Sequence, residues 1–280
     1  MQRKRRWRRV IYFFVGLSLA YVVGCYYLAS KYVRPGTTNA GPPPIGLSQT
    51  TGINAWASAI KPGQSVYILV HGYGGSQFGW TDVANGLADM GVGVVIPALP
   101  GHDNRTNETS GFALKESQIV LDTVNWAREK AGKDVKIVLV GISMGGAACW
   151  LASERDPTIH AVATEGSFAR LGPATASWFD RKAPGASTYL APVIWFAKRM
   201  SGVDPALVNP VEAAAKWKGK PSLVIHGDED QLFPVENGKE LAAASGGVCW
   251  IVKGATHAHC SDVNLREYVL KLAELSMEKN

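Results

Sequence analysis

Ser143 follows an apolar run and is flanked by two glycines, an arrangement in which a serine can act as a nucleophile. The stretch IVLVGISMGG covers residues 137–146, and Gly141 and Gly145 stand two positions before and after the serine. This GxSxG spacing is typical of a sharp strand-to-helix turn that exposes the hydroxyl, where a Cβ at either glycine would collide with neighbouring backbone. A turn residue or a helix cap would also explain the serine. The motif is therefore a hypothesis that depends on partner residues elsewhere.

A nucleophilic serine needs a base, and the base needs an orienting acid. Two later segments contain such residues. The segment GDEDQLFP follows the apolar run SLVIH and contains Asp228 and Asp230, and KGATHAHC follows VCWIV and contains His257 and His259. Because both segments follow predicted strands, we expect them at the sheet edge that carries Ser143. The spacing alone leaves open which acid and which histidine are the partners.

The elements that must position these residues form an alternating pattern. Short apolar runs at 65–70, 92–97, 135–140, 161–164, 222–226 and 248–252 predict strands buried on both faces. Stretches of helical character lie between them, for example at 79–91 and 115–132. Strand and helix in alternation predict an α/β fold with a mostly parallel sheet flanked by helices. One interval, about 167–220, is longer and rich in aromatic residues, and it predicts a helical cap inserted into the fold.

From about residue 51 to its end, the chain resembles the α/β-hydrolase superfamily, in particular its serine esterase and lipase-like members. Four blocks in the family's order carry the resemblance: HGYGGS at 71–76, GISMGG at 141–146, HGDEDQLFP at 226–234 and KGATH at 253–257. The family's HGxxD and GxxH patterns match Asp230 and His257. The resemblance therefore implies a triad of Ser143, Asp230 and His257. The other four histidines are interpreted as structural: His71, His102, His160 and His226.

Two backbone amides are predicted to form an oxyanion hole. Met144 follows the nucleophile and begins a predicted helix, whose N-terminus favours an anion. Tyr73, in the HGYGG loop, matches the second donor loop of the family. The glycines around Tyr73 allow this loop to approach the serine closely.

The N-terminal segment predicts a membrane anchor. Of the 29 Lys and Arg, six lie in residues 1–9, and the 23 that remain equal the number of Asp and Glu, so the basic charge belongs to this head. Residues 10–30 contain no charge and are long enough to cross a bilayer. The positive-inside rule then places residues 1–9 in the cytoplasm and the enzyme outside, in the periplasm of a Gram-negative host. The segment VVGC, ending at Cys25, also fits a lipobox, so a lipoprotein anchored at Cys25 and a secreted protein are alternatives.

Residues 31–44 are rich in Pro and Gly and predict a linker, which leaves 45–280 as the hydrolase domain. The domain contains Cys149, Cys249 and Cys260, so a single bridge between Cys249 and Cys260 is conceivable but a disulfide framework is not.

The sequence predicts a membrane-anchored serine hydrolase that cleaves esters of a hydrophobic or lipid-like acyl group. An amidase, peptidase or thioesterase with the same triad, and a non-catalytic interaction protein on the same fold, are alternatives. No zinc-ligand cluster, phosphate loop or dinucleotide motif is present in the sequence, so no metal or other cofactor is expected. No nucleic-acid partner is expected either, because the chain after residue 9 is formally neutral.

Overall fold

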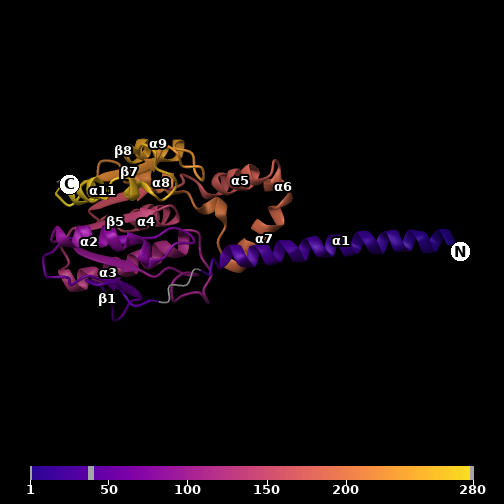
Figure 1. The fold of residues 1–280 in the computed structure, drawn as a ribbon, viewed down its shortest axis with the longest axis horizontal. Helices are drawn as coiled ribbons and strands as arrows, with labels where there is room; N and C mark the ends of the chain where they lie inside the picture. The colour runs from indigo at the N-terminus through magenta and orange to yellow at the C-terminus, as the bar shows by residue number, and fades with distance from the viewer. Residues whose placement is uncertain (1, 37–40, 278–280) are drawn as a thin grey trace.

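The fold is a mostly parallel β-sheet with helices on both faces and one long N-terminal helix (Figure 1). It is seen in a computed structural model that describes residues 2–36 and 41–277. Within these residues the sheet has eight strands in the order β1-β2-β4-β3-β5-β6-β7-β8. The strands are β1 (Ser48–Gln49), β2 (Ala55–Ala57), β3 (Val66–Val70), β4 (Gly93–Pro97), β5 (Ile137–Ile142), β6 (Ala161–Glu165), β7 (Ser222–Gly227) and β8 (Val248–Val252).

Strands β3 to β8 are parallel, and β1 and β2 pair antiparallel at one edge. The predicted parallel sheet is confirmed, and every residue of β3, β4, β6 and β7 is buried. Every residue is buried because side chains alternate between the two faces of the sheet and both faces are covered. In β3, Ile68 and Val70 join one hydrophobic cluster, and Tyr67 and Leu69 join another on the opposite face.

Helices cover both clusters. The first cluster includes residues of α3 (Leu114–Ala131), α4 (Met144–Arg155), α8 (Pro210–Lys216) and α9 (Glu236–Ser245). The second includes residues of α2 (Thr81–Asp89), which follows the 3₁₀ turn η1 (Gln77–Trp80), and of α10 (Cys260–Val263) and α11 (Leu265–Glu274). The four cysteines are free, so Cys249 and Cys260 form no bridge.

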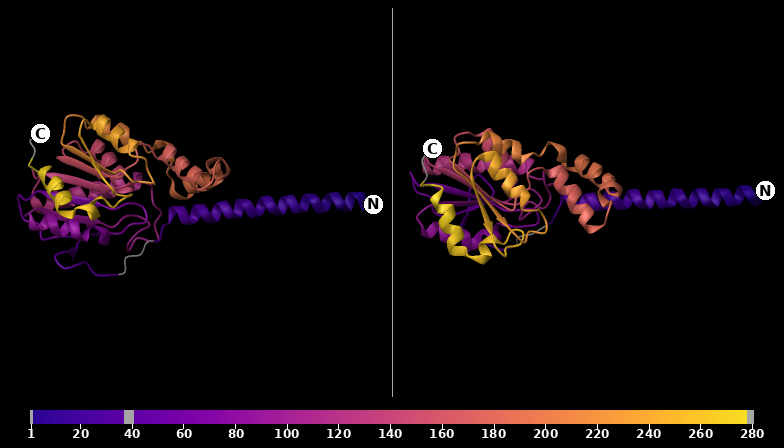
Figure 2. Two further views of the ribbon diagram at one scale, coloured as in Figure 1. Left: turned by 45° about the horizontal axis from the view of Figure 1, so that its top comes forward. Right: turned by 90° about the horizontal axis from the view of Figure 1, so that it is seen from above.

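The chain between β6 and β7, residues 166–221, contains α5 (Leu171–Lys182), α6 (Ala186–Tyr189), α7 (Ala191–Ser201), the 3₁₀ turn η2 (Pro205–Leu207) and α8. We call this segment the β6–β7 connection. Its helices α5, α6 and α7 project beyond the sheet, and α7 lies beside the C-terminal part of α1 (Figures 1 and 2).

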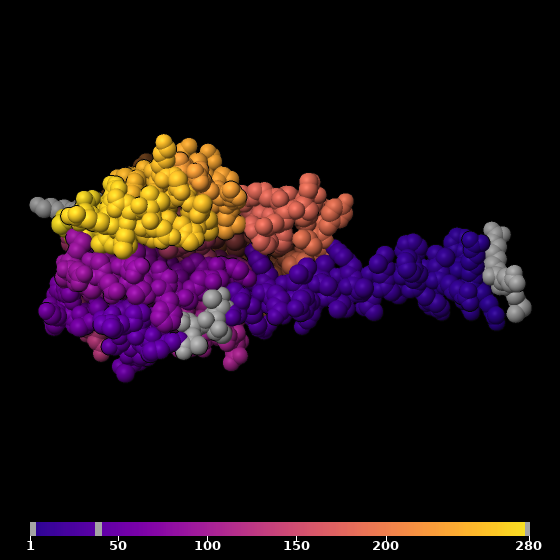
Figure 3. All heavy atoms as spheres, in the orientation of Figure 1, coloured from indigo at the N-terminus to yellow at the C-terminus, as the bar shows by residue number. Residues whose placement is uncertain are grey.

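Helix α1 (Gln2–Val33) is continuous over 32 residues, which corresponds to about 48 Å. Among residues 2–36 and 41–277, it contains the one stretch that is long and apolar enough to cross a membrane, Lys4–Val33. Its N-terminal part extends away from the rest of the molecule, whereas its C-terminal part packs against α7 and the domain (Figure 3).

The C-terminal end of α1 is bound directly to the hydrolase domain. The carbonyl oxygen of Val33 accepts a hydrogen bond from the amide of Ser110, and the amide of Gly36 donates to the carbonyl of Gly101. Pro35 explains why the helix ends here, because the residue before a proline disfavours helical backbone. The helix thus includes the first three residues of the range 31–44 that the sequence predicts as a linker. Val33 and Gly36, within that range, already contact the domain.

Candidate active site

The backbone at Ser143 is held in a strained turn between β5 and α4. Ser143 has φ +54° and ψ −118°, a conformation that non-glycine residues seldom adopt. A Cβ on Gly141 would lie 2.4 Å from the carbonyl carbon of Gly145, and one on Gly145 would lie 2.2 Å from the carbonyl oxygen of Val70. Both glycines are therefore required for α4 to begin this close to β3 and β5.

Ser143, His257 and Asp230 form a hydrogen-bonded chain. The Nε2 atom of His257 lies 3.0 Å from Ser143 Oγ, and its Nδ1 atom lies 2.7 Å from Asp230 Oδ2. The other carboxylate oxygen, Oδ1, accepts from the amides of Leu232 at 2.8 Å and Phe233 at 2.9 Å. Because Asp230 accepts a hydrogen bond from the Nδ1–H group, the Nε2 atom of His257 is left as the acceptor for the serine hydroxyl.

The two rival residues point elsewhere. Asp228 is exposed and accepts a hydrogen bond of 2.6 Å from the amide of Gly254. His259 lies in the pocket wall, but its Nδ1 bonds to the exposed Asp262 at 2.6 Å. Of the two acids and two histidines that the spacing leaves open, the structure brings Asp230 and His257 to the serine.

The charge on Asp230 is stabilised from two sides. Burial alone would raise the pKa of Asp230, but hydrogen bonds from His226, His257 and the Phe233 amide outweigh it and hold the pKa well below its usual range. His226 is fully buried, with Nε2 3.3 Å from Asp230 Oδ2 and 3.0 Å from the carbonyl oxygen of Phe233. The sequence gives His226 only a structural role. Its position four residues before the acid, at the end of the same strand, is the signal for this contact.

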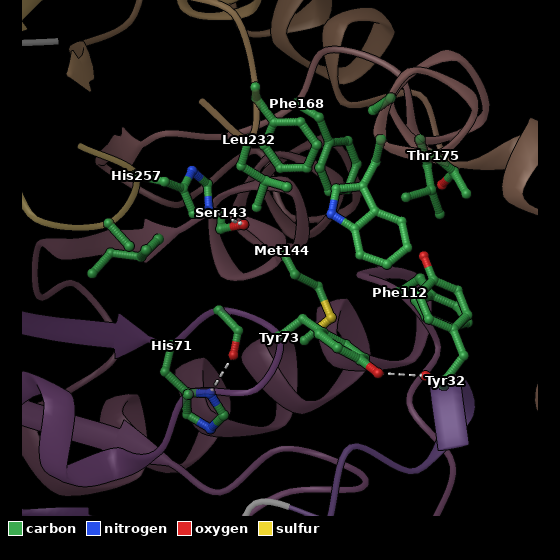
Figure 4. Close-up of a pocket in the computed structure, with 18 of the residues that line it drawn as sticks. Tyr32, His71, Tyr73, Phe112, Ser143, Met144, Phe168, Thr175, Leu232 and His257 are labelled. Atoms are coloured by element: carbon green, nitrogen blue, oxygen red, sulfur yellow. Dashed lines mark hydrogen bonds between the residues drawn. The ribbon is translucent and has the colours of Figure 1, made fainter. Parts of the chain in front are cut away.

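The loop after β3, residues 71–76, lies against Ser143. A Cβ on Gly72 would be 3.2 Å from Ser143 Cβ, so the approach is as close as a side chain would permit. Tyr73 and Met144 both line the same cavity as Ser143 (Figure 4).

Buried hydrogen bonds to Asp103 hold both ends of this loop. Nε2 of His71 lies 3.0 Å from Asp103 Oδ2, and Asp103 Oδ1 accepts a 3.0 Å hydrogen bond from the Gln77 amide. Both ends of the loop are thereby tied to the segment after β4.

His102 holds the middle of the loop and must be neutral to do so. Its Nε2 accepts a 2.9 Å hydrogen bond from the Gly74 amide, and its Nδ1 lies 2.9 Å from the carbonyl oxygen of Pro100, to which it donates. Burial, with the neighbouring His71, lowers the pKa of His102 to about 4. The imidazole is therefore uncharged at neutral pH and keeps a lone pair for Gly74.

Comparison with known proteins identifies the family of this chain. The family model described as the alpha/beta hydrolase family matches residues 67–269. The chain belongs to the alpha/beta hydrolase family. No curated protein matches it in sequence.

Solved structures share the fold of this alpha/beta hydrolase at low sequence identity. An esterase of Pyrococcus furiosus is 19% identical, with a TM-score of 0.62, over 80% of this chain and 85% of the other. The protein Est1E of Butyrivibrio proteoclasticus is 19% identical, with a TM-score of 0.59, over 83% of this chain and 98% of the other. An alpha/beta hydrolase from a sediment metagenome of the Mar Chica lagoon in Morocco is 18% identical, with a TM-score of 0.55, over 81% and 96%.

Ser143 opens into a cavity of about 860 Å³ with a largely apolar wall. Three parts of the chain build the wall: the residues around the triad, the β6–β7 connection and the end of α1. The lining residues from the β6–β7 connection include Phe168, Leu171, Trp178, Phe179, Leu190 and Val193. The alpha/beta hydrolase thus has a largely apolar cavity beside Ser143. Among the described residues, no group of three or more His, Cys, Asp or Glu is arranged to hold a metal ion.

The contribution of α1 to this cavity is absent from the sequence predictions. Leu28, Lys31 and Tyr32 of α1 line the cavity. The Tyr32 ring stacks on Phe112 at 4.8 Å and lies 6.5 Å from Trp178, centroid to centroid. No local pattern distinguishes these residues from the rest of an apolar helix, because the partners are distant in sequence.

Proposed function

We propose that this alpha/beta hydrolase is a membrane-anchored serine hydrolase that cleaves carboxylic esters of hydrophobic acyl groups. One observation carries the proposal: the hydrogen-bonded chain from Asp230 through His257 to Ser143 ends in an apolar cavity of about 860 Å³. Fold alone would not support an activity, because one fold serves many functions.

In the proposed mechanism, Ser143 Oγ attacks the ester carbonyl carbon while His257 Nε2 accepts the hydroxyl proton. Asp230 keeps the imidazole in the required tautomer and stabilises its positive charge. The negative charge on the former carbonyl oxygen is stabilised by the amides of Tyr73 and Met144. The protonated His257 then donates its proton to the leaving alkoxide, and an acyl-enzyme remains on Ser143. Water, deprotonated by His257, attacks the acyl-enzyme and releases the acid, with the proton returned to Ser143.

The apolar wall supports a hydrophobic acyl group as the substrate, with the β6–β7 connection acting as the cap over it. Burying an acyl chain against aromatic residues contributes about 0.8 kcal/mol per methylene. The triad itself would serve an amide or a thioester equally well, so a panel of esters, thioesters and amides with matched acyl chains ranks these substrates. Hydrolysis of amides in preference to esters would contradict the ester assignment.

Helix α1 supports a transmembrane anchor with residues 1–9 in the cytoplasm and the catalytic domain on the outer side. The alternative of a lipid attached to Cys25 fits the packing poorly. Cys25 is 2% exposed, one of three residues at four-residue spacing, with Ala29 and Val33, that belong to the core cluster. In a lipoprotein, cleavage would make Cys25 the N-terminal residue, and its lipid would have to leave a position that is buried against neighbouring helices.

The test is labelling of the full-length chain by a fluorophosphonate in detergent, with Ser143→Ala as the control. We expect the wild type to label covalently and the variant not to label. Full-length protein is needed because deletion of residues 1–40 would remove Leu28, Lys31 and Tyr32 from the cavity wall. A folded wild type that fails to label, or labels as strongly after Ser143→Ala, contradicts the proposal.

A further inference from the structure

Helix α7 packs along part of the uncharged segment of α1, and α6 contacts the same part of α1 through one hydrogen bond. The hydroxyl of Tyr21 donates to the carbonyl oxygen of Tyr189, and the rings of Tyr26 and Phe196 meet edge to face at 5.5 Å. Further along α1, Ala29 is fully buried. Contact therefore begins near residue 21 and continues to the end of the helix.

The length of the uncharged segment determines the depth of this contact. Residues 10–30 have no charged side chain, and 21 helical residues span about 31 Å, close to the hydrocarbon thickness of about 30 Å. If α6 and α7 lay wholly outside the bilayer, only residues 10–20 would remain to cross it. Eleven helical residues reach about 16 Å, roughly half of what is needed. A full crossing by α1 thus brings α6 and α7 to the depth of the outer leaflet.

The side chains on α6 and α7 suit a membrane interface. Tyr189 and Trp195 are 71% and 53% exposed, and Tyr and Trp are the side chains enriched at membrane–water interfaces. The guanidinium of Arg199 lies 4.9 Å from the Trp195 ring, and Lys198 pairs with Asp204. Because Tyr189 is level with Tyr21 and Phe196 with Tyr26, α7 runs in the direction of α1. Its basic end is therefore nearest the domain, at the level of the head groups, and its apolar start lies deeper.

The catalytic cavity extends toward the same region. Leu28 and Lys31 of α1, Lys182 of α5 and Leu190 before α7 all line it, together with Ser143. The cavity is thus continuous from the nucleophile to the helices that the length of α1 brings to the bilayer. Figure 3 shows these helices packed against α1 with no other part of the described chain over their outer face in this view.

We propose that α6 and α7 are embedded in the outer leaflet, and that the substrate is an acyl lipid that passes from this leaflet into the cavity alongside α1. This substrate class rests on the proposed function, since Ser143 must be the nucleophile, whereas the membrane contact of α7 does not. The acyl ester would reach Ser143 without crossing water. A water-soluble ester would have no use for this path.

Photo-cross-linking tests the membrane contact independently of catalysis. A benzophenone amino acid replaces Trp195 in full-length protein reconstituted into vesicles of phosphatidylcholine and phosphatidylglycerol. The matched control carries it at Val248, which is exposed at the start of β8, the strand end opposite to the serine. We expect lipid adducts at position 195 and none at position 248. Absence of adducts at position 195 overturns the proposal.

Kinetics test the path of the substrate. The variant Trp195→Glu places a charge at membrane depth, and Val248→Glu places one on the opposite side. We expect Trp195→Glu to lower hydrolysis of a long-chain ester dissolved in the vesicles by roughly tenfold. Hydrolysis of a soluble short-chain ester and fluorophosphonate labelling of Ser143 should stay unchanged, as should every activity of Val248→Glu. Equal loss on both esters, or no loss on the vesicle ester, contradicts entry from the bilayer. Failure of labelling in the wild type contradicts the proposed function instead.

Discussion

The hydroxyl of Tyr73 donates a 2.8 Å hydrogen bond to the carbonyl oxygen of Tyr32 (Figure 4). Tyr32 lies in the last turn of α1, and Tyr73 lies in the loop beside Ser143, so this bond connects the N-terminal helix to the candidate active site. Burial raises the pKa of the Tyr73 phenol, with Tyr32 as a second cause, and the phenol therefore stays protonated and able to donate. The position of α1 and the position of the loop are thereby coupled.

The first prediction concerns this coupling. The variant Tyr73→Phe keeps the ring, which stacks on Phe112 at 6.1 Å, and removes only the hydrogen bond. A hydrogen bond of this kind contributes about 0.5–1.5 kcal/mol, so we expect kcat/KM for a short-chain ester to fall by about 2–10-fold. The thermal unfolding midpoint should change little. An unchanged kcat/KM would mean that α1 does not influence the loop.

The second prediction distinguishes the two acidic residues after β7. Asp230→Asn removes the charge that orients His257, and we expect kcat to fall by roughly 10⁴. Asp228→Asn changes an exposed side chain that contacts only the Gly254 amide among the described residues, and we expect kcat within a few-fold of the wild type. Steady-state hydrolysis of a soluble ester measures both. Comparable losses of kcat in the two variants would contradict the assignment of Asp230 as the acid that orients His257.

The third prediction concerns the turn at the nucleophile. In Gly145→Ala the new Cβ would lie 2.2 Å from the carbonyl oxygen of Val70, a contact that only a backbone shift can relieve. We expect more than about 4 kcal/mol of destabilisation, which leaves little or no folded protein. Gly79→Ala is the control, because nothing lies within 4 Å of a Cβ there. Soluble yield and thermal unfolding measure the effect, and a folded, stable Gly145→Ala would refute the close packing at this turn.

The fourth prediction concerns stability in acid. In the folded protein, burial and the neighbouring His71 lower the pKa of His102 from 6.5 to about 4. Between these values the unfolded chain binds a proton at His102 and the folded protein does not. The free energy of unfolding therefore falls as the pH falls from about 6.5 to about 4, by about 3 kcal/mol from this group, and the loss ends below pH 4.

Denaturant unfolding at several pH values measures this loss. His102→Gln keeps an acceptor for the Gly74 amide and cannot take up a proton, so we expect its unfolding free energy to depend less on pH in this range. His259→Gln, which changes an exposed histidine, should follow the wild-type profile. A wild-type-like profile for His102→Gln would mean that His102 is not the acid-sensitive group.

Much of the hydrolase fold could be predicted from local patterns. The runs at 65–70, 135–140 and 222–226 are apolar without alternation, and strands buried on both faces require this. The glycines at 141 and 145 predict the turn because only glycine lacks the Cβ that would collide with backbone, that of α4 for Gly141 and that after β3 for Gly145. The loops after β7 and β8 contain the candidate acid and base for the same topological reason, since parallel strands end at one edge of the sheet.

The sequence chooses between neighbouring residues only through the family resemblance. Asp228 and Asp230 differ by two positions in one turn, and the family's HGxxD pattern implies Asp230 without a physical reason. The structure distinguishes them because the Leu232 and Phe233 amides and His226 surround Asp230 alone, while Asp228 faces solvent. The same holds for His257 and His259.

By itself, the sequence determined that this protein is an alpha/beta hydrolase with a serine, acids and histidines at its strand ends and an apolar, positively headed helix before them. The strands and the apolar helix follow from residue type and period along the chain, whereas the family follows from the resemblance of four motif blocks. Only the tertiary structure decided that the last turns of α1 form part of the cavity wall. That contact depends on Tyr32 meeting Phe112 and Trp178, side chains that are far apart in sequence and come together only when the whole chain is packed.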